Sequence, residues 1–333
     1  MQSARELLVL ALATLSGCAS NHAALNPAGP RAQAIANLLM IFCTVSTAVY
    51  LTVIGFLLWS LFRRRASADD AHALARQERR SRRVIGSAVG LTVVTLLTLA
   101  TADFAVQRSL QAHPADALRI VLTGHQYWWE VEYDDPDPSR RLHTANEVHI
   151  PVHRAVEFVL TSSDVIHSFW LPSLMGKKDL IPGYTNTEVV IADHPGVFTG
   201  QCAEFCGLQH AQMRLALTAE APAAYERWRQ QQLAEAAAPT DDRARRGQQV
   251  FMNSTCILCH AIQGTSAGAT VGPDLTHLAS RQMIGAGAMP NTPANLASWI
   301  LNPHTFKPGV TMPATALSGD ELSALTAYLG GLR

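Results

Sequence analysis

Cysteine is scarce in this sequence, with six residues in 333. Four of them belong to two short motifs, Cys-x3-Cys at residues 202–206 and Cys-x-x-Cys-His at residues 256–260. Only Cys18 and Cys43 lie outside these motifs. If the motifs bind cofactors, too few cysteines remain for the disulfide framework that is typical of small exported domains.

Charged residues are also few, at 16% of the sequence with a net charge of zero, whereas 48% is apolar. This apolar fraction is high for a wholly soluble protein, so we expect a membrane part in a chain of two or three domains. The charges are segregated. Residues 63–83 carry 8 Lys and Arg against 3 Asp and Glu, and residues 105–220 carry 8 against 14. We expect membrane lipids as partners and no nucleic acid.

Residues 1–17 are typical of an export signal of the lipoprotein type. Arg5 precedes an apolar run from Leu7 to Leu15, and the Leu-Ser-Gly-Cys that ends at Cys18 resembles a lipobox. At a lipobox the cysteine is lipidated and the chain is cleaved before it. A plain signal peptide with an incidental cysteine is the alternative.

Two uncharged runs predict a transmembrane hairpin over residues 33–104. The first, within residues 33–62, is long enough to cross the roughly 30 Å hydrocarbon layer as a helix. The second covers Val84 to Ala102. Neither run has a polar face, which argues against two buried helices of a soluble domain. The arginine-rich stretch between them favours the cytoplasm, so everything after Phe104 is expected on the outer face.

Residues 105–220 change to short β-rich runs separated by Pro, Gly and Asp clusters. Many short strands with turn signals between them favour a sandwich or a Greek-key barrel. The predicted strands cover residues 118–122, 128–133, 147–150, 156–160, 187–191 and 213–218.

One loop of this region combines side chains that bind copper. Cys202, Cys206, His210 and Met213 bring two thiolates, an imidazole and a thioether together. Soft sulfur ligands favour copper and imidazole suits it, whereas calcium or magnesium would want oxygen ligands. A second metal that shares the sulfurs needs another donor, for which His167 is the best candidate. A local disulfide and a zinc site are the alternatives, and the histidine and methionine behind the cysteines favour copper.

The Cys-x-x-Cys-His motif is the signature of covalently bound c-type haem. The thiols of Cys256 and Cys259 add to the two vinyl groups, which leaves His260 beneath the iron as the proximal ligand. A disulfide beside a chance histidine is the alternative. A partly helical linker, rich in Ala, Gln and Glu, is expected over residues 221–241, before this motif.

The segments around the motif suit a small all-α haem domain over residues 242–333. Residues 243–251 fit an amphipathic helix, and Ser318 and Glu321 form a capping box for a final helix. Pro273 follows the motif at a distance where its carbonyl could accept a hydrogen bond from the motif's histidine.

The ligand loop resembles the binuclear copper A centre of the cytochrome c oxidase subunit II family. The order of His167, Cys202-x-Glu204-x-Cys206, His210 and Met213 matches, and so do the flanking Val-Ile-His-Ser-Phe-Trp-Leu-Pro, Ile-Pro-Gly and Gly-Gln-Cys-Ala-Glu-Phe-Cys-Gly. The resemblance implies a cupredoxin-like Greek-key barrel in which the cysteine sulfurs bridge two coppers. It also implies that the Glu204 carbonyl is the last ligand, and that its side chain reaches a magnesium ion shared with subunit I.

The C-terminal domain resembles a class I cytochrome c. Met312, in Lys-Pro-Gly-Val-Thr-Met-Pro-Ala, is similar to that family's axial methionine. Met283 and Met289 are the alternatives, in a segment without such flanking residues. A methionine ligand raises the haem potential, as an electron acceptor from another cytochrome needs.

Together these resemblances imply subunit II of a caa-type haem-copper oxidase, in a bacterial inner membrane with its copper and haem domains on the periplasmic face. Electrons would pass from cytochrome c or a cytochrome bc complex to the chain's own haem c, then to copper A and to haem a of subunit I. Subunit III is a further expected partner. Oxygen reduction and proton translocation would belong to the whole enzyme, with oxygen reduced in subunit I.

The aromatic triplet Tyr127, Trp128 and Trp129 lies where electrons enter in this family, although the family commonly begins it with Trp. Ordinary strand packing is the alternative for each ring. The family's second helix often starts with a glutamate that feeds a proton channel. Here Arg82 and Arg83 stand instead, so that role is not expected.

Three other functions share some of these features. A quinol oxidase subunit II would lack the copper ligands. A copper chaperone would carry Cys-x3-Cys without the following histidine and methionine. An electron relay of a nitric or nitrous oxide reductase pathway could carry the same ligands, so it stays open.

Overall fold

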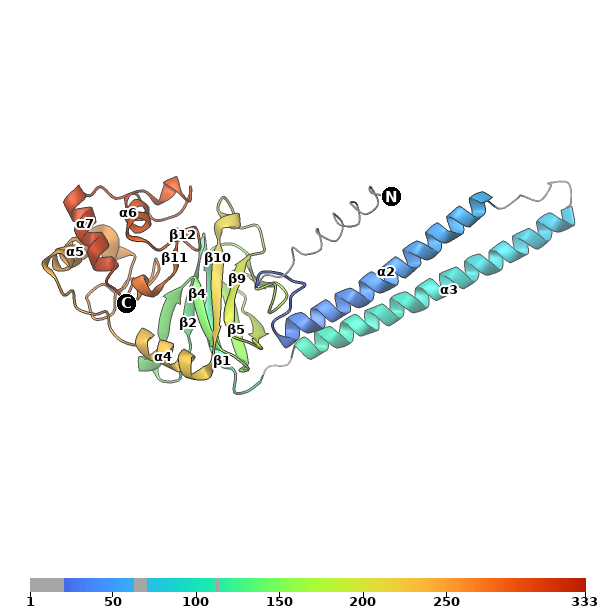
Figure 1. Ribbon diagram of the computed structural model, residues 1–333, viewed down its shortest axis with the longest axis horizontal. Helices are drawn as coiled ribbons and strands as arrows, with labels where there is room; N and C mark the ends of the chain where they lie inside the picture. Colours follow the sequence, from blue (N-terminus) through green and yellow to red (C-terminus); the bar gives the residue numbers. More distant parts are fainter. Residues whose placement is uncertain (1–20, 63–70, 112–113) are drawn as a thin grey trace, which may run out of the picture. The chain divides into compact units, whose positions relative to one another are not determined.

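The computed structural model describes residues 21–62, 71–111 and 114–333 (Figure 1). The expected export signal at residues 1–17 and the candidate lipidation site Cys18 lie outside the described residues.

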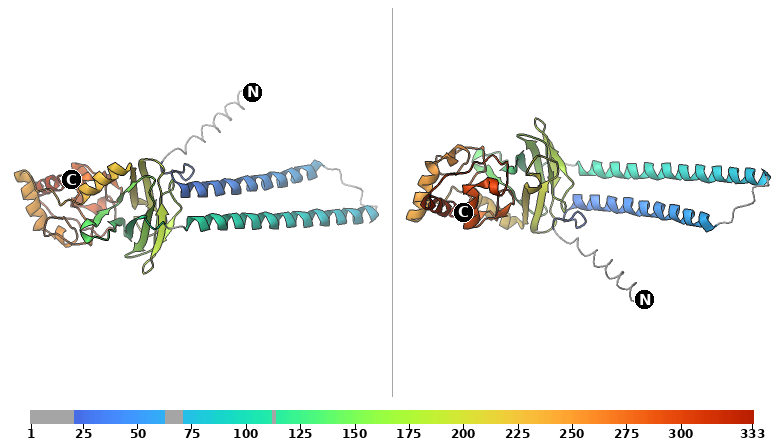
Figure 2. Two further views of the ribbon diagram at one scale, coloured as in Figure 1. Left: turned by 90° about the horizontal axis from the view of Figure 1, so that it is seen from below. Right: turned by 90° about the horizontal axis from the view of Figure 1, so that it is seen from above.

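Two long helices, α2 (Pro30–Phe62) and α3 (Ala71–Leu110), form the hairpin and run alongside each other (Figure 2). Both contain a stretch that is long and apolar enough to cross a membrane, with mean hydropathies of 2.1 and 2.0 over an 18-residue window. The second helix begins well before the apolar run that starts at Val84. Arginine and glutamate are good helix formers, and an ion pair between Arg82 and Glu78, at 2.8 Å, supports the first turns.

Ten strands between residues 118 and 220 form two five-stranded sheets, with the orders β3-β2-β1-β5-β8 and β4-β10-β9-β6-β7. The strands are β1 (Leu118–His125), β2 (Trp128–Tyr133), β3 (Leu142–Ala145), β4 (Glu147–Pro151), β5 (Val156–Ser162), β6 (His167–Trp170), β7 (Lys178–Leu180), β8 (Asn186–Val190), β9 (Gly196–Cys202) and β10 (Arg214–Glu220). Alternate residues of β1, β2 and β10 are buried, as expected when one face of each sheet packs on a shared core. The predicted cupredoxin-like barrel is confirmed.

A short helix, α4 (Pro222–Gln232), follows the last strand and lies against the barrel. Trp228 stacks on His149 with 4.2 Å between ring centroids. The buried Arg229 donates to the Asp135 carboxylate at 2.7 Å. The segment expected to be a linker is therefore attached to the barrel along its helical part.

The C-terminal domain contains α5 (Asp242–Met252), α6 (Pro293–Leu301) and α7 (Gly319–Leu329). The buried residues of α5 are Ala244, Gly247 and Phe251, so the predicted amphipathic helix is confirmed. Both hydrogen bonds of the predicted capping box are present at Ser318. At Gly247 a Cβ atom would lie 2.0 Å from the Ala324 carbonyl oxygen, which means that α5 and α7 cross in close contact.

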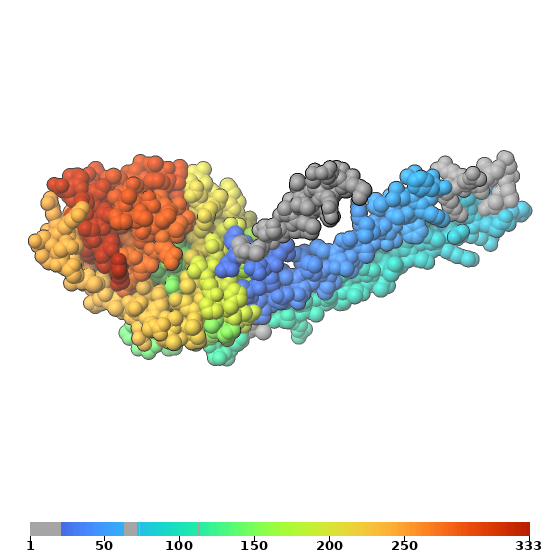
Figure 3. Space-filling model, in the orientation of Figure 1, coloured from blue at the N-terminus to red at the C-terminus, as the bar shows by residue number. Residues whose placement is uncertain are grey.

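Short elements complete the chain. Residues 283–290 form a small hairpin, β11 (Met283–Ile284) and β12 (Met289–Pro290), which an all-α prediction did not include. The 3-10 turns are η2 (Pro138–Arg140), η3 (His210–Gln212), η4 (Thr255–Leu258), η5 (Leu278–Ser280) and η6 (Pro303–Thr305). In the space-filling view, atoms of the C-terminal domain adjoin those of the barrel (Figure 3).

Candidate metal and haem centres

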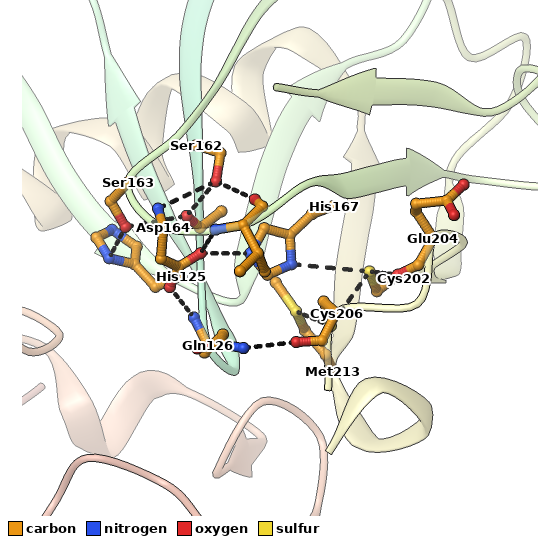
Figure 4. A network of polar contacts seen from close by, with 12 residues as sticks. His125, Gln126, Ser162, Ser163, Asp164, His167, Cys202, Glu204, Cys206 and Met213 are labelled. Atoms are coloured by element: carbon orange, nitrogen blue, oxygen red, sulfur yellow. Dashed lines mark hydrogen bonds and ion pairs between the residues drawn. The ribbon is translucent and has the colours of Figure 1, made fainter. Parts of the chain in front are cut away.

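The predicted copper ligands His167, Cys202, Cys206 and Met213 lie close together (Figure 4). His167 begins β6 and Cys202 ends β9, and the antiparallel pairing of these strands brings them together. The Cys202 Sγ lies 3.9 Å from His167 Nδ1 and 3.8 Å from Cys206 Sγ. The Cys206 Sγ lies 3.8 Å from His210 Nδ1 and 4.0 Å from Met213 Sδ. Five donor side chains thus surround one small volume.

This donor set fits a soft metal. Both cysteines are free, and they are buried together with Met213 and His167. A structural disulfide would need an S–S distance of about 2.05 Å, far shorter than the distance between these sulfurs. Buried thiolates together with a thioether and imidazole are the ligands that copper prefers.

The two contacts of Glu204 point in different directions. Its carbonyl oxygen lies 3.2 Å from the Cys202 Sγ, on the ligand side of the loop. Its carboxylate accepts a hydrogen bond from Lys177 Nζ at 3.3 Å. Lys177 also pairs with Asp179 at 3.7 Å. The Lys177 contact could not be predicted from local spacing, because 27 residues separate the partners.

Asp164 orients the histidine that comes from β6. Its Oδ1 lies 2.8 Å from His167 Nε2, which places the other ring nitrogen, Nδ1, toward the sulfurs. Carboxylates in this position fix the tautomer of metal-binding histidines. Gly124 lies against the same ring, since a Cβ atom there would be 2.7 Å from His167 Cδ2. The i, i+3 spacing of Asp164 and His167 was the available sequence signal for this residue.

The two sulfurs are in contact and titrate as a pair. A hydrogen bond from Cys206, the largest cause, and another from His167 outweigh burial and lower the pKa of Cys202 to about 3. The pKa of Cys206 is raised far above its usual range by the neighbouring Cys202 sulfur and by burial. Burial pushes the pKa of His167 down, but its hydrogen bonds to Cys202 and Asp164 raise it overall. The pair therefore holds one thiolate at neutral pH and releases the remaining proton when both sulfurs bind metal.

A cavity of about 400 Å³ lies beside the haem-attachment motif and is lined by Cys256, Cys259 and His260. The His260 Nδ1 contacts the Pro273 carbonyl oxygen at 2.7 Å, as the sequence predicted. This contact leaves Nε2 as the nitrogen that can bind iron. Burial, the largest cause, lowers the pKa of His260, so the ring is in the neutral form that a metal ligand requires.

Further features of the cavity fit a haem. At Gly272 a Cβ atom would lie 2.8 Å from His260 Cε1, so the ring fills the space that the glycine leaves. The half-buried Arg281 lines the cavity. Its Nη2 donates to the Asp274 carbonyl oxygen at 2.5 Å, whereas its buried Nε has no hydrogen-bond partner among the described residues. An unpaired guanidinium N–H beside an apolar cavity suits a hydrogen-bond acceptor, and a haem carboxylate would be one. Sequence reasoning missed Arg281. Of the three candidate axial methionines, Met312 and Met283 line the cavity.

The aromatic triplet lies between the two centres. Tyr127 and Trp128 line the haem cavity, and Trp128 stacks on His125 with 4.3 Å between ring centroids. Trp129 is fully buried and contacts the edge of His167 at a centroid distance of 6.1 Å. The Tyr127 hydroxyl accepts a hydrogen bond from the Leu208 amide of the ligand loop at 3.0 Å. All three rings pack against neighbouring side chains, as ordinary strand packing predicts. They also connect the haem cavity to the ligand loop.

The chain combines a cupredoxin-like barrel, whose loop carries donors for a soft metal, with a haem domain and a membrane hairpin. This combination defines a membrane-anchored electron-transfer protein. Family models agree with this class. Residues 135–220 match the periplasmic domain of cytochrome c oxidase subunit II, and residues 244–333 match cytochrome c.

Two individual proteins are similar over most of the chain, and a solved domain is similar over part of it. The cytochrome c oxidase subunit 2 of Alkalihalophilus pseudofirmus is 35% identical, over all of this chain and 98% of the relative. That of Bacillus subtilis is 31% identical, over 72% of this chain and 69% of the relative. The periplasmic domain of subunit II of Bradyrhizobium japonicum cytochrome oxidase is 31% identical, over 36% of this chain and 95% of that domain, with a TM-score of 0.34.

The chain belongs to the cytochrome c oxidase subunit 2 family. It carries the fused C-terminal cytochrome c domain that the sequence predicted, and it is a subunit of an oxidoreductase. Its two domains imply copper A and haem c as cofactors.

Proposed function

We propose that this chain relays electrons from cytochrome c or a cytochrome bc complex, through its own haem c and a binuclear copper A centre, to haem a of subunit I. Oxygen is reduced to water in that subunit. The observation that carries the proposal is the path between the two centres: Trp128 lines the haem cavity, and its neighbour Trp129 contacts His167. Both centres supply one-electron redox chemistry when they are bound.

The copper ligands are proposed to be both cysteine sulfurs as bridges, the two histidines, the methionine and the Glu204 carbonyl. The support is their convergence, with four sulfur contacts of 3.8 to 4.0 Å. Two of the donors lie at the ends of paired strands, so the barrel holds them in place. Rigid donors keep the geometry change small when an electron arrives.

The haem ligands are proposed to be Cys256 and Cys259 as covalent attachments, with His260 and Met312 on the iron. Met283 also lines the cavity and is the alternative to Met312. Arg281 is proposed to pair with a haem carboxylate. This pairing would satisfy a buried guanidinium nitrogen that has no partner among the described residues.

The remaining assignments are proposed from the sequence pattern and are consistent with family membership. We assign residues 1–17 to the signal, 33–104 to the hairpin, 105–220 to the copper domain, 221–241 to the linker and 242–333 to the haem domain. The expected location is a bacterial inner membrane with both domains on the periplasmic face, in contact with subunits I and III. The Glu204 carboxylate would reach a shared magnesium ion only by leaving Lys177, which it contacts here.

Copper and haem analysis of the purified full-length chain, with electron paramagnetic resonance, tests the proposal. We expect two coppers that share one unpaired electron and one covalent haem. Cys206→Ser should abolish the copper signal and the oxygen consumption driven by reduced cytochrome c, while the haem stays attached. Cys43→Ser, at an exposed position in α2, is the matched control and should change neither. A single zinc ion, or reduction of nitrous oxide in place of oxygen, would contradict the proposal.

A further inference from the structure

Lys307 is a buried lysine that lies between the copper and haem domains. The sequence contains only three lysines, and this one is 1% exposed. Its ammonium donates three hydrogen bonds, to the carbonyl oxygens of Tyr127 at 3.0 Å, Gln212 at 2.9 Å and Gly285 at 2.9 Å. An ammonium group has three protons, so each one has an acceptor.

The three acceptors belong to different parts of the fold. Tyr127 lies in the turn between β1 and β2, beside the haem cavity. Gln212 directly precedes the proposed copper ligand Met213. Gly285 belongs to the β11–β12 hairpin of the haem domain. One side chain of the haem domain therefore binds both the aromatic turn and the copper loop.

Neighbouring contacts extend this interface along the copper loop. The Gln209 side-chain amide donates to the Pro308 carbonyl at 3.0 Å, and the Arg214 amide donates to the Ala286 carbonyl at 3.0 Å. Leu208 contacts Gly309, where a Cβ atom would lie 3.0 Å from its Cδ1. The ligand loop is thus held by the haem domain on both sides of Met213.

The ammonium carries a charge without a carboxylate partner. No ion pair between Lys307 and an acidic side chain occurs in the part of the chain that the structure describes. Burial lowers the pKa of Lys307 to about 8, while the Cys206 sulfur acts in the opposite direction. The group is therefore mostly protonated at pH 7. A buried positive charge near an electron acceptor stabilises its reduced form, because low-dielectric surroundings screen the charge weakly.

We propose that Lys307 is a positioning residue that fixes the haem domain on the copper loop and, through its charge, favours the reduced state of both centres. The inference rests on the proposed function. Lys307 does not bind a metal. It holds the interface through the carbonyl groups that it binds, and it acts on the potentials through its charge.

The test compares Lys307→Met with Lys178→Met in the full-length chain. Lys178 lies on β7, so its variant removes the same charge and serves as the matched control. In Lys307→Met we expect the haem-to-copper electron transfer rate, measured after photoreduction of the haem, to fall at least about tenfold, because two charge-assisted hydrogen bonds across the interface are lost. The midpoint potentials of copper and haem should both fall. Lys307→Gln keeps a hydrogen-bond donor without the charge and should recover part of the rate but not the potentials.

Two results would overturn the inference. The first is a Lys307→Met chain with both cofactors bound that matches Lys178→Met in transfer rate and in both potentials. The second comes from amine labelling of the unmodified chain, which needs no variant to fold. Lys307 should stay unlabelled while Lys177, whose side chain is 52% exposed, reacts. Equal labelling of the two lysines would refute the interface. Labelling does not depend on either cofactor, so it separates this inference from a failure of the proposed function.

Discussion

Gly124→Ala should weaken the copper centre without changing any proposed ligand. The new methyl group would lie 2.7 Å from His167 Cδ2 and 3.0 Å from its Cγ. Carbon atoms in contact prefer about 3.5–4.0 Å, so the ring must move by roughly 0.8 Å. It has little room to do so, because the histidine is fully buried between Trp129 and Asp164.

Gly124→Ala is expected to lower both the stability of the core and the affinity for copper. Overpacking of this kind destabilises a core by about 1–3 kcal/mol. Metal–ligand distances tolerate about 0.2 Å, so the shift should also lower copper affinity, by about 10–100-fold if it acts like the loss of an orienting partner. Copper affinity would be measured by competition with a chelator, together with the paramagnetic resonance spectrum and the thermal unfolding of the metal-free chain.

Gly268→Ala is the matched control, because a Cβ atom there meets nothing within 4 Å. It should leave copper affinity and the spectrum unchanged. If Gly124→Ala bound copper as tightly as the unmodified chain and gave the same spectrum, the close packing of Gly124 on the His167 ring would be refuted.

Three further changes test the surroundings of the two centres. Asp164→Asn should lower copper affinity about 10–100-fold, measured by the same competition, because the ring of His167 loses its orienting carboxylate. Gly272→Ala should displace the His260 ring, whose Cε1 would lie 2.8 Å from the new methyl group, and should alter the optical spectrum and midpoint potential of the haem. Ser318→Ala removes the capping hydrogen bonds of α7 and should lower the free energy of unfolding of the haem domain by about 1 kcal/mol in a denaturant titration, with the copper signal unchanged.

The sequence predicted which side chains converge at the proposed copper site, but not the contacts that hold them in place. Cys202, Cys206 and Met213 are neighbours along the chain, so local spacing was enough to group them. His167 was included by its chemistry, and its position depends on the pairing of β6 with β9. Lys307 gave no local signal. Two of its three acceptors, Tyr127 and Gln212, belong to the copper domain and lie 180 and 95 residues away in the sequence.

Six of the ten barrel strands were predicted, namely β1, β2, β4, β5, β8 and β10, each with bounds within three residues of the observed ones. The run at residues 128–133 matches β2, and that at residues 147–150 lies within β4. The strands β3, β6 and β7 were missed because each has only three or four residues. The seven-residue β9 was missed as well, because two of its positions are glycines, at residues 196 and 200. Met213 was expected to begin a strand, but it ends a 3-10 turn and the strand starts at Arg214. The turn directs the thioether toward the sulfurs.

The close crossing at Gly247 limits how this domain can be engineered. Replacing a helical glycine by alanine is a common route to a more heat-resistant protein, and typically gains about 0.4–1 kcal/mol. At this position the same exchange would drive a methyl group into the backbone of α7 and separate the two helices. Gly319, at the start of α7, has open space instead. A thermostabilised version of the haem domain should therefore begin at that end and leave the crossing untouched.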